Sequence, residues 1–469
     1  MLRFNFKSAV CLVFIFNSVI CLTVKAQNNR EDSLFIKKIY NQALEEQIAY
    51  KWLYYLSETI GHRIAGSPQN MAAIEFTNQI LDSIGCTKVW KQPCTINYWY
   101  RGAPEVVEVI NHPLVGTKKI HALALGNSAG TPEVGISGDV VEVKTIEEVK
   151  KLGEALKGKI VFFNRAFHDA DFHTFTSYGS CVDQRVFGPN AVAKFGAKAC
   201  LVRSMTGRRD DVPHTGTSIF DEGVEAIPSL AISTRDADLL SQWLAVSPTQ
   251  IYIKTNCEQR GPKQSYSVIG EIKGSVKPEE IIVVGGHLDS WDVGGGAHDD
   301  GAGCVHSMEV LHLFRKLGYQ PKRTIRCVLF QNEENGLAGA RTYAQVSNEN
   351  KEFHLAAIES DAGGFTPHGF SYDADSAVMV KYEKTLMKWK DLLSIFELKL
   401  QRGGSGADVG QLKSQKGLLL GLKPDSQRYF DYHHTEIDRI EAVHPRELAL
   451  GSAAMASLVY LMDKYGLGD

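Results

Sequence analysis

The chain has 469 residues, of which 44% are hydrophobic, and this is enough for one large core and a second, smaller one. Its 51 Lys and Arg residues nearly balance its 54 Asp and Glu residues, the formal net charge is −3, and no dense basic stripe occurs. These features argue against nucleic acid or an anionic membrane surface as the main partner.

The N-terminus has the three parts of a secretory signal peptide. Arg3 and Lys7 supply positive charge, residues 9–23 form an apolar segment, and residues 24–26 read Val-Lys-Ala, a small-residue cleavage site. The apolar segment is short for a membrane span. We therefore expect residues 1–26 to be a signal peptide. After its cleavage the protein would be periplasmic or extracellular, without a stable membrane span.

The first part of the mature chain combines helices and strands. Residues 34–56 and 68–84 have helical apolar spacing, and Ser67 is a suitable N-cap for the second helix, with Pro68 at its first position. Strand-like runs follow at 89–98, 106–115 and 120–125. We assign residues 27–125 to a main domain that is completed later in the chain.

The sequence changes character between residues 126 and 257. Short strands and helices alternate there and are joined by Gly, Pro, Ser and Thr. The expected strands are 139–143, 159–163 and 199–202, and the expected helices are 146–152, 191–195 and 239–244. We interpret residues 126–257 as an inserted domain with its own small core, so residues 27–125 and 258–469 form the main domain.

Strands and helices also alternate after residue 258. The expected strands are 281–284, 324–330, 355–358 and 418–422, and the expected helices are 302–317, 337–344, 382–393 and 445–465. This alternation predicts an α/β fold, with a central sheet covered by helices on both faces. In such sheets, ligands bind beyond the carboxyl ends of the strands.

Imidazole and carboxylate side chains follow several of these strand ends. Carboxylates are rarely buried unless they are paired or bound to a metal, and imidazole with carboxylate is a ligand set suited to zinc. The set is too large for one tetrahedral ion and instead suits two ions that share a carboxylate. It comprises His287, Asp299, the pair Glu333-Glu334, Asp361 and His434.

Neighbouring residues suggest supporting roles. Adjacent glutamates in an extended segment point apart, so one can bind a metal while the other acts as general base toward water. Asp289, two residues after His287, is placed to accept the second imidazole N–H and fix its tautomer. The loop that contains Ser405 and Asp408 is either part of the substrate pocket or a flexible turn.

Together, these motifs resemble those of the co-catalytic zinc aminopeptidase and carboxypeptidase family. They read His-x-Asp, Gly-Ala-x-Asp-Asp-Gly, Glu-Glu, Ser-Asp-Ala-Gly and His-His-Thr-x-x-Asp. The resemblance is strongest to the family's glutamate carboxypeptidases and covers nearly the whole mature chain. It implies the zinc exopeptidase fold, with a mixed, mostly parallel sheet, and residues 126–257 as a protease-associated domain.

The resemblance also implies roles for the candidate residues and a cis peptide bond between Asp299 and Asp300. Two zinc ions would be bound per chain, and Glu333 would be the general base. Asp299 would bridge the ions, with His287 and Asp361 completing one position and Glu334 and His434 the other. Two histidines complicate this assignment, because His433 adjoins His434 and His298 stands where relatives have a small or apolar residue.

We therefore expect an exported zinc metallopeptidase that hydrolyses short peptides as a carboxypeptidase or dipeptidase. An aminopeptidase with the same metal core is the main alternative, and the family suggests a homodimer. Two rivals come from other classes. Residues 126–130 read Gly-Asn-Ser-Ala-Gly, the pattern of a serine hydrolase with Ser128 as nucleophile, although no helix is expected directly after it. The other rival is a non-catalytic binding protein.

Overall fold

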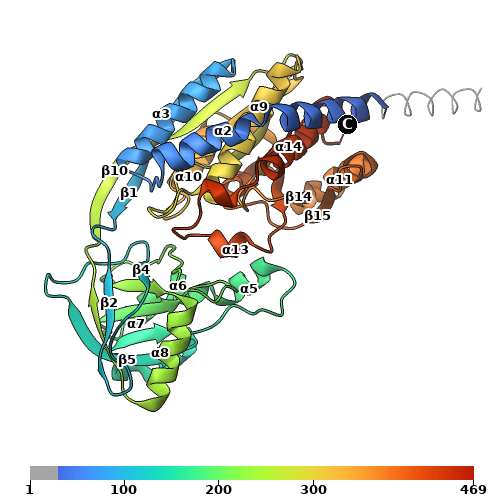
Figure 1. Cartoon of the computed structure of the whole chain (residues 1–469). Coiled ribbons are helices and arrows are strands. Elements are labelled where there is room, and N and C mark those ends of the chain that lie inside the picture. Colours follow the sequence, from blue (N-terminus) through green and yellow to red (C-terminus); the bar gives the residue numbers. More distant parts are fainter. Residues whose placement is uncertain (1–29, 469) are drawn as a thin grey trace, which may run out of the picture.

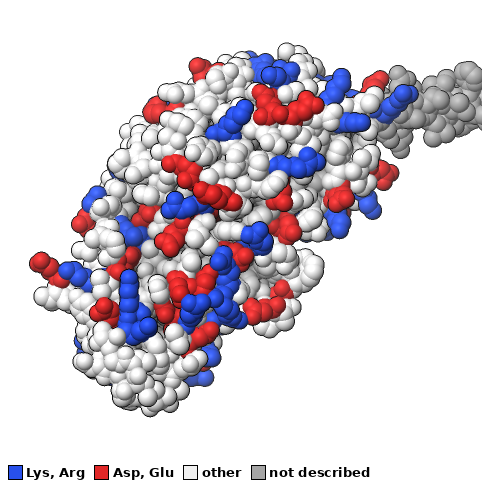
Figure 2. All heavy atoms as spheres, in the orientation of Figure 1, with Lys and Arg blue, Asp and Glu red and all other residues white. Residues whose placement is uncertain are grey.

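The computed structural model describes residues 30–468, so the predicted signal peptide lies outside the described residues. Figure 1 shows two lobes, and the long strands β1 and β10 run toward the junction between them. We call residues 106–254 the inserted lobe and the other described residues the large lobe. Within residues 30–468, no helix is long and apolar enough to cross a membrane. Acidic and basic side chains are interspersed over the face seen in Figure 2.

The large lobe is built on a mixed sheet of eight strands. The four central strands run parallel, and antiparallel pairs join them to the outer strands on both sides. In spatial order, the strands are β1 (Lys88–Tyr100), β10 (Glu258–Ile272), β12 (Arg323–Phe330), β11 (Lys277–His287), β13 (Phe353–Glu359), β16 (Leu418–Pro424), β14 (Pro367–Asp373) and β15 (Lys399–Arg402).

The central strands are apolar at successive positions because both faces of the sheet are covered. Along β11, Ile282 and Val284 pack into the larger core cluster, whereas Ile281 and Val283 pack on the opposite face. Helices of the N-terminal and C-terminal regions cover the first face, and α10 covers the second. The helices of this lobe are 30–46, α2 (Ile48–Tyr54), α3 (Pro68–Ser83), α9 (Ala302–Lys316), α10 (Ala338–Glu349), α11 (Ser376–Leu386), α12 (Lys390–Ser394), α13 (Tyr429–Tyr432) and α14 (Pro445–Tyr465).

The α/β fold with a mixed sheet agrees with the sequence prediction, but some elements differ. The single helix expected over 34–56 is interrupted at Gln47, whose φ of 47° lies in the left-handed region, and a π-helical turn follows at Tyr55–Ile60. Ser67 caps α3 as expected and accepts the N–H of Asn70. Strand β10 was not predicted, because its first half, Glu258 to Gln264, is polar and largely exposed.

The inserted lobe contains a second mixed sheet of eight strands. Their spatial order is β3 (Gly116–Lys119), β2 (Val106–His112), β9 (Gln250–Lys254), β5 (Ile136–Val143), β6 (Ile160–Phe163), β7 (Ala199–Arg203), β8 (Ser229–Ile232) and β4 (Ala122–Ala124). Its helices are α4 (Ile146–Leu152), α5 (Thr174–Cys181), α6 (Asp183–Val186), α7 (Gly188–Ala193) and α8 (Thr234–Val246).

The start of the inserted lobe was placed too late by the sequence analysis. Strands β2, β3 and β4 lie before residue 126 but pair within the second sheet, where Val107 and Val109 join its core. At the other end of the lobe, β9 ends at Lys254 and β10 already belongs to the first sheet.

The two lobes contact each other through an aromatic cluster and a charged cluster. Phe167 of the inserted lobe packs with Phe430 of the large lobe. At the chain crossing, Arg101 makes a two-pronged ion pair with Asp292 of its own lobe, and its Nη1 donates to the carbonyl of Ala124 in the inserted lobe at 2.6 Å. Both clusters lie beside the carboxyl edge of the large sheet.

A buried arginine holds the loop that follows β11. The guanidinium of Arg63 donates to three backbone carbonyls, those of Leu288 at 2.7 Å, Gly295 at 2.7 Å and Gly296 at 2.9 Å. The side chain is fully buried. One side chain therefore satisfies carbonyls from both ends of a glycine-rich loop that forms no regular structure.

We predict that Arg63→Met lowers the free energy of unfolding by about 3 kcal/mol or more. The reason is that each buried carbonyl left unpaired costs about 1–3 kcal/mol. Chemical denaturation of the purified variant measures the loss. Arg402→Met is the matched control, because the Arg402 side chain is 59% exposed in its pair with Glu383 and should contribute little. Equal stability of the two variants would contradict the assigned role of Arg63.

Candidate metal centre

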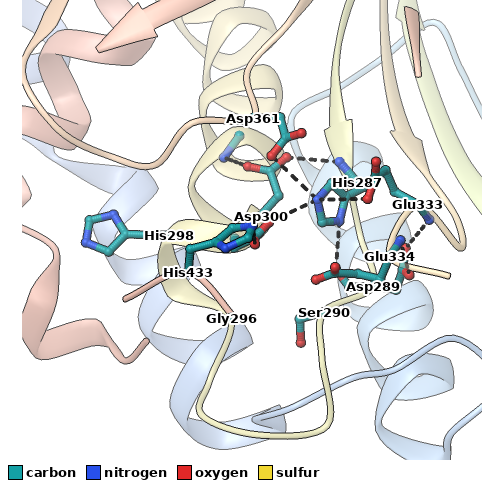
Figure 3. A network of polar contacts seen from close by, with 12 residues as sticks. His287, Asp289, Ser290, Gly296, His298, Asp300, Glu333, Glu334, Asp361 and His433 are labelled. Atoms are coloured by element: carbon teal, nitrogen blue, oxygen red, sulfur yellow. Dashed lines mark hydrogen bonds and ion pairs between the residues drawn. The ribbon is translucent and has the colours of Figure 1, made fainter. Parts of the chain in front are cut away.

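The candidate ligands meet at the carboxyl edge of the large sheet. His287 is the last residue of β11, Glu333 follows β12 by three residues, and Asp361 follows β13 by two. These three strands are adjacent and parallel, so their ends lie together. Figure 3 shows His287, Glu333 and Asp361 turned toward one another.

Asp299 lies at the middle of the group. Its Oδ1 is 3.2 Å from Nε2 of His287, and its Oδ2 is 3.2 Å from Nε2 of His434. The peptide bond between Asp299 and Asp300 is cis, as the family resemblance implied. One carboxylate therefore faces an imidazole on each side, which is the arrangement expected of a bridging ligand.

The other candidates complete two subgroups. Asp361 Oδ1 lies 3.6 Å from His287 Nε2, and Glu334 Oε2 lies 3.2 Å from His434 Nε2. His433 is farther from the bridging carboxylate, because its Nε2 is 3.7 Å from Asp299 Oδ2. This geometry favours His434 over His433, although His433 is near enough to belong to the same group of potential ligand atoms.

Three further aspartates, Asp289, Asp300 and Asp438, hold the backbone of the segments that carry these side chains. Asp300 accepts the N–H of His287 at 3.0 Å, and Asp438 accepts the N–H of Asp299 at 3.0 Å. Gly286 allows the first contact, since a Cβ there would lie 2.4 Å from Oδ2 of Asp300. Each carboxyl group thus accepts a backbone hydrogen bond that fixes the segment of a candidate ligand.

Asp289 differs from its predicted role. His287 Nδ1 lies 2.9 Å from the backbone carbonyl of Asp289, not from its carboxylate. The carboxylate instead accepts the N–H groups of Glu333 at 3.1 Å and Glu334 at 3.4 Å. The prediction was correct about the neighbourhood and wrong about the atom, because a residue-spacing argument does not distinguish a side-chain acceptor from a main-chain one.

Burial and crowding shift the pKa values of these groups in the protein without metal. Burial alone would lower the pKa of His287, but the contacts with Asp299 and Asp361 outweigh it and hold that pKa well above its usual value. Burial, reinforced by the charge of Asp299, raises the pKa of Glu334 to about 7. Burial also raises the pKa of Glu333 well above the usual range, and the nearby Asp361 adds to the shift.

These shifts and unpaired atoms fit a cation site. Oε1 of Glu334 and Oδ2 of Asp299 are buried without a hydrogen bond. His287, Asp299 and Asp361 offer ligand atoms within 4.8 Å of one another, and so do Asp299, His433 and His434. A divalent cation would favour the charged carboxylates and the neutral imidazoles. Its positive charge would also offset the crowding of buried carboxylates that raises their pKa values.

The comparison with known proteins identifies the family. Residues 267–459 match peptidase family M28. Carboxypeptidase Q of Bos taurus is 32% identical over 425 residues, which cover 90% of this chain and 86% of that protein. The chain belongs to peptidase family M28. Carboxypeptidase Q of Homo sapiens is 33% identical over 426 residues, with the same two coverages. The predicted resemblance is confirmed, and the protein is a zinc-dependent exopeptidase of this family.

Known structures of M28 proteins share the fold. The peptidase M28 precursor from Shewanella amazonensis SB2B is 31% identical, with a TM-score of 0.85 over 93% of this chain and 97% of that one. A zinc aminopeptidase from Bacillus subtilis is 20% identical, with a TM-score of 0.63 over 88% of this chain and 94% of that one. The second likeness concerns the fold alone.

We call the candidate ligands of this M28 peptidase the metal group; they are His287, Asp299, Glu334, Asp361 and His434. The metal group opens into a cleft of about 950 Å³ between the lobes. Glu333, Asp361 and His434 line it from the large lobe, and Tyr178 and Arg185 line it from the inserted lobe. Ser405 and Asp408, predicted as possible pocket residues, are not among the lining residues. Both are buried in a loop that packs beneath the edge of the sheet, where the N–H of Val409 donates to Glu359.

Two alternatives that the sequence left open do not fit the structure. Ser128 is fully buried, accepts the N–H of Ser229 at 2.8 Å and is followed by a loop instead of a helix, so it is no serine nucleophile. His298, considered as an accidental ligand, points away from the metal group (Figure 3). Its ring stacks on Phe365, and its Nδ1 accepts the N–H of Gly364 at 3.1 Å.

Sequence reasoning missed the residues that the inserted lobe places at the site. The carbonyl of Thr215 lies 3.1 Å from His434 Nδ1, and Arg185 Nη1 lies 3.3 Å from the same atom. Neither residue belongs to a motif with recognisable spacing. The segment Thr215-Gly216-Thr217 offered only a weak signal, a glycine between polar residues, which is typical of any loop.

We predict that zinc stabilises the protein more strongly as the pH rises toward about 9. Burial would lower the pKa of His434, but Glu334 and Asp299 outweigh it and raise that pKa from 6.5 to about 9. The metal-free protein therefore gains stability from the bound proton below pH 6.5 and loses it as the pH rises through about 9. Zinc requires the neutral ring and competes with that proton.

Thermal unfolding at several pH values, with and without a fixed free zinc concentration, measures this effect. We expect the difference in Tm between the zinc-loaded and the metal-free protein to widen with pH. In a His434→Ala variant the same difference should depend less on pH. A difference that is constant or that narrows in the wild-type protein would contradict the prediction.

Proposed function

We propose that this M28 exopeptidase is a two-zinc carboxypeptidase or dipeptidase that hydrolyses short peptides. The convergence of two imidazoles and three carboxylates beside Glu333, at the edge of an open cleft, carries this function. Asp299 would be shared by the two ions, His287 and Asp361 would hold one of them, and Glu334 and His434 would hold the other.

The zinc ions, when bound, would make a water molecule more acidic and would stabilise negative charge on the carbonyl oxygen of the substrate. Glu333 takes the proton of the attacking water and returns it to the leaving amine. Its side chain is 22% exposed, and its Oε2 lies 4.0 Å from His287 Nε2, so it borders both the metal group and the cleft. Asp289 keeps it in place through the backbone N–H.

The choice of carboxypeptidase over aminopeptidase is supported by two observations. The curated relatives named carboxypeptidase Q are 32–34% identical over 88–90% of the chain, whereas the zinc aminopeptidase of Bacillus subtilis is 20% identical. In addition, Arg185 and Arg341 line the cleft and supply positive charge that suits a free C-terminal carboxylate. An aminopeptidase with the same metal group is the second candidate.

The remaining features of the proposal concern the whole protein. We infer that the inserted lobe is a protease-associated domain, supported by the Gly-Lys-Ile-Val run at 158–161 and the Ile-Pro-Ser-Leu-Ala-Ile run at 227–232, which lead into β6 and β8. We also propose export to the periplasm or the extracellular space, on the basis of residues 1–26. A homodimer is suggested only by family resemblance and stays a prediction.

We predict that Glu333→Gln lowers peptide hydrolysis about 100-fold or more while both zinc ions stay bound. The amide keeps the size of the side chain but cannot accept the proton, and general-base catalysis contributes about 10²–10⁴-fold. Hydrolysis rates and zinc content of the purified variant are measured together. Glu279→Gln is the control, because Glu279 also belongs to a Glu-Glu pair but is exposed. Full activity of Glu333→Gln would refute its role as general base.

A second prediction concerns the end of the peptide that must be free. With zinc restored, we expect hydrolysis of free dipeptides and tripeptides, and loss of hydrolysis when the C-terminus is amidated. Blocking the N-terminus should be tolerated by a carboxypeptidase and should abolish cleavage by a strict dipeptidase. Cleavage of C-blocked peptides with free N-termini would instead identify an aminopeptidase. Product analysis by mass spectrometry separates these cases.

A further inference from the structure

The two imidazoles of the metal group are held from different lobes. His287 Nδ1 lies 2.9 Å from the carbonyl of Asp289, which belongs to the large lobe. His434 Nδ1 lies 3.1 Å from the carbonyl of Thr215, which belongs to the inserted lobe. In both rings Nδ1 can donate its hydrogen to a carbonyl, which leaves Nε2 free to bind a metal.

Thr215 also holds the main chain of His434. Its N–H donates to the carbonyl of His434 at 3.0 Å, so the two residues are joined by a main-chain contact and a ring contact. His434 has a φ of 63°, in the left-handed region, where a residue with a side chain pays about 1–2 kcal/mol. Contacts from the inserted lobe therefore support a ligand whose backbone conformation is unfavourable by itself.

Arg185 and Gly216 set the position of the Thr215 carbonyl. Arg185 Nη1 donates to that carbonyl at 3.3 Å, and its Nη2 donates to the hydroxyl of Tyr178 at 2.7 Å. Arg185 is only 5% exposed. The guanidinium packs directly on Gly216, where a Cβ would lie 2.3 Å from Cζ of Arg185. Gly216 has a φ of 140°, so a side chain at this position meets both a steric and a conformational obstacle.

We propose that the Thr215 carbonyl, positioned by Arg185 and Gly216, controls the metal affinity of the His434 position, so that this affinity depends on how the inserted lobe docks. The His287 position is independent of the inserted lobe, because its imidazole is oriented by Asp289. This inference rests on the two-zinc function proposed above. It makes Thr215 and Arg185 positioning residues and the His434 position the more labile of the two.

The test compares Gly216→Ala with Gly223→Ala. Gly223 lies in the same lobe with a φ of 83°, but a Cβ there would meet nothing within 4 Å, so the control adds a left-handed alanine without disturbing Thr215. Zinc per chain is measured after equilibration with a chelator series. We expect Gly216→Ala to lose one zinc ion at about 10- to 100-fold higher free zinc than the wild type, the usual effect of disturbing the partner of a ligand. The second zinc ion and the control should behave as in the wild type.

Arg185→Met is measured alongside, because it removes the donor to the Thr215 carbonyl without adding bulk at Gly216. It should weaken the same zinc ion. To identify that ion, Gly216→Ala is also combined with His287→Ala and with His434→Ala. The single remaining zinc ion should weaken only in the His287→Ala background, where the His434 position is the one left.

The outcomes separate this inference from the proposed function. A wild-type protein that binds one zinc ion would refute the two-zinc function itself. A wild-type protein that binds two, with both weakened equally or neither weakened in Gly216→Ala and Arg185→Met, would overturn the role of Thr215. The role would also be overturned if Gly216→Ala weakened the zinc ion left in the His434→Ala background.

Discussion

The excess of buried carboxylates over buried cations at the carboxyl edge of the large sheet is the constraint on which this structure depends. Asp299 and Glu334 are 5% exposed, and both have an oxygen without a hydrogen bond. Burying a carboxylate without a partner is costly, and the raised pKa of Glu334, about 7, reflects that cost. Protonation lowers the cost of burying a carboxylate, but only by removing the negative charge that a catalyst needs. Divalent cations relieve it and keep the charge.

The acidic residues around the site divide into two kinds by what they contact. Asp289, Asp300 and Asp438 accept backbone N–H groups of the segments that carry the ligands. Arg63 lies among them and donates to the loop after β11. Their carboxyl oxygens are therefore used to fix the main chain. The carboxylates left free to face the cleft are those that the family resemblance assigns to zinc or to base catalysis.

Much of this site could be predicted from the sequence because strand ends mark it. An apolar run such as residues 281–284 indicates a strand buried on both faces, and neighbouring parallel strands bring their next polar residues to one edge. His287, Glu333 and Asp361 are placed by this rule. His434 is not, since nine residues separate it from the end of β16, and only the His-His-Thr motif indicated it.

The errors have a common physical origin in contacts between segments distant in sequence. The apolar pattern of β2 and β4 would suit a strand of either sheet. It therefore could not show that β2 pairs with β9 and β4 with β8. Polar residues of β10 hid a strand whose position is set by pairing with β1. Asp289 was assigned the wrong acceptor atom because its carboxylate is used by the backbone of Glu333. The sequence of a single segment does not indicate which distant segment it pairs with.

Both lobes support the metal group, and this links the cleft to the proposed chemistry. The cleft lies between the lobes, and the inserted lobe contributes Tyr178 and Arg185 to its wall. Arg185 also contacts the carbonyl that orients His434. A side chain that borders the cleft thus contacts both His434, a proposed metal ligand, and the carbonyl that orients it. The large lobe alone supplies the proposed ligands, but the contacts that orient His434 come from Thr215 of the inserted lobe.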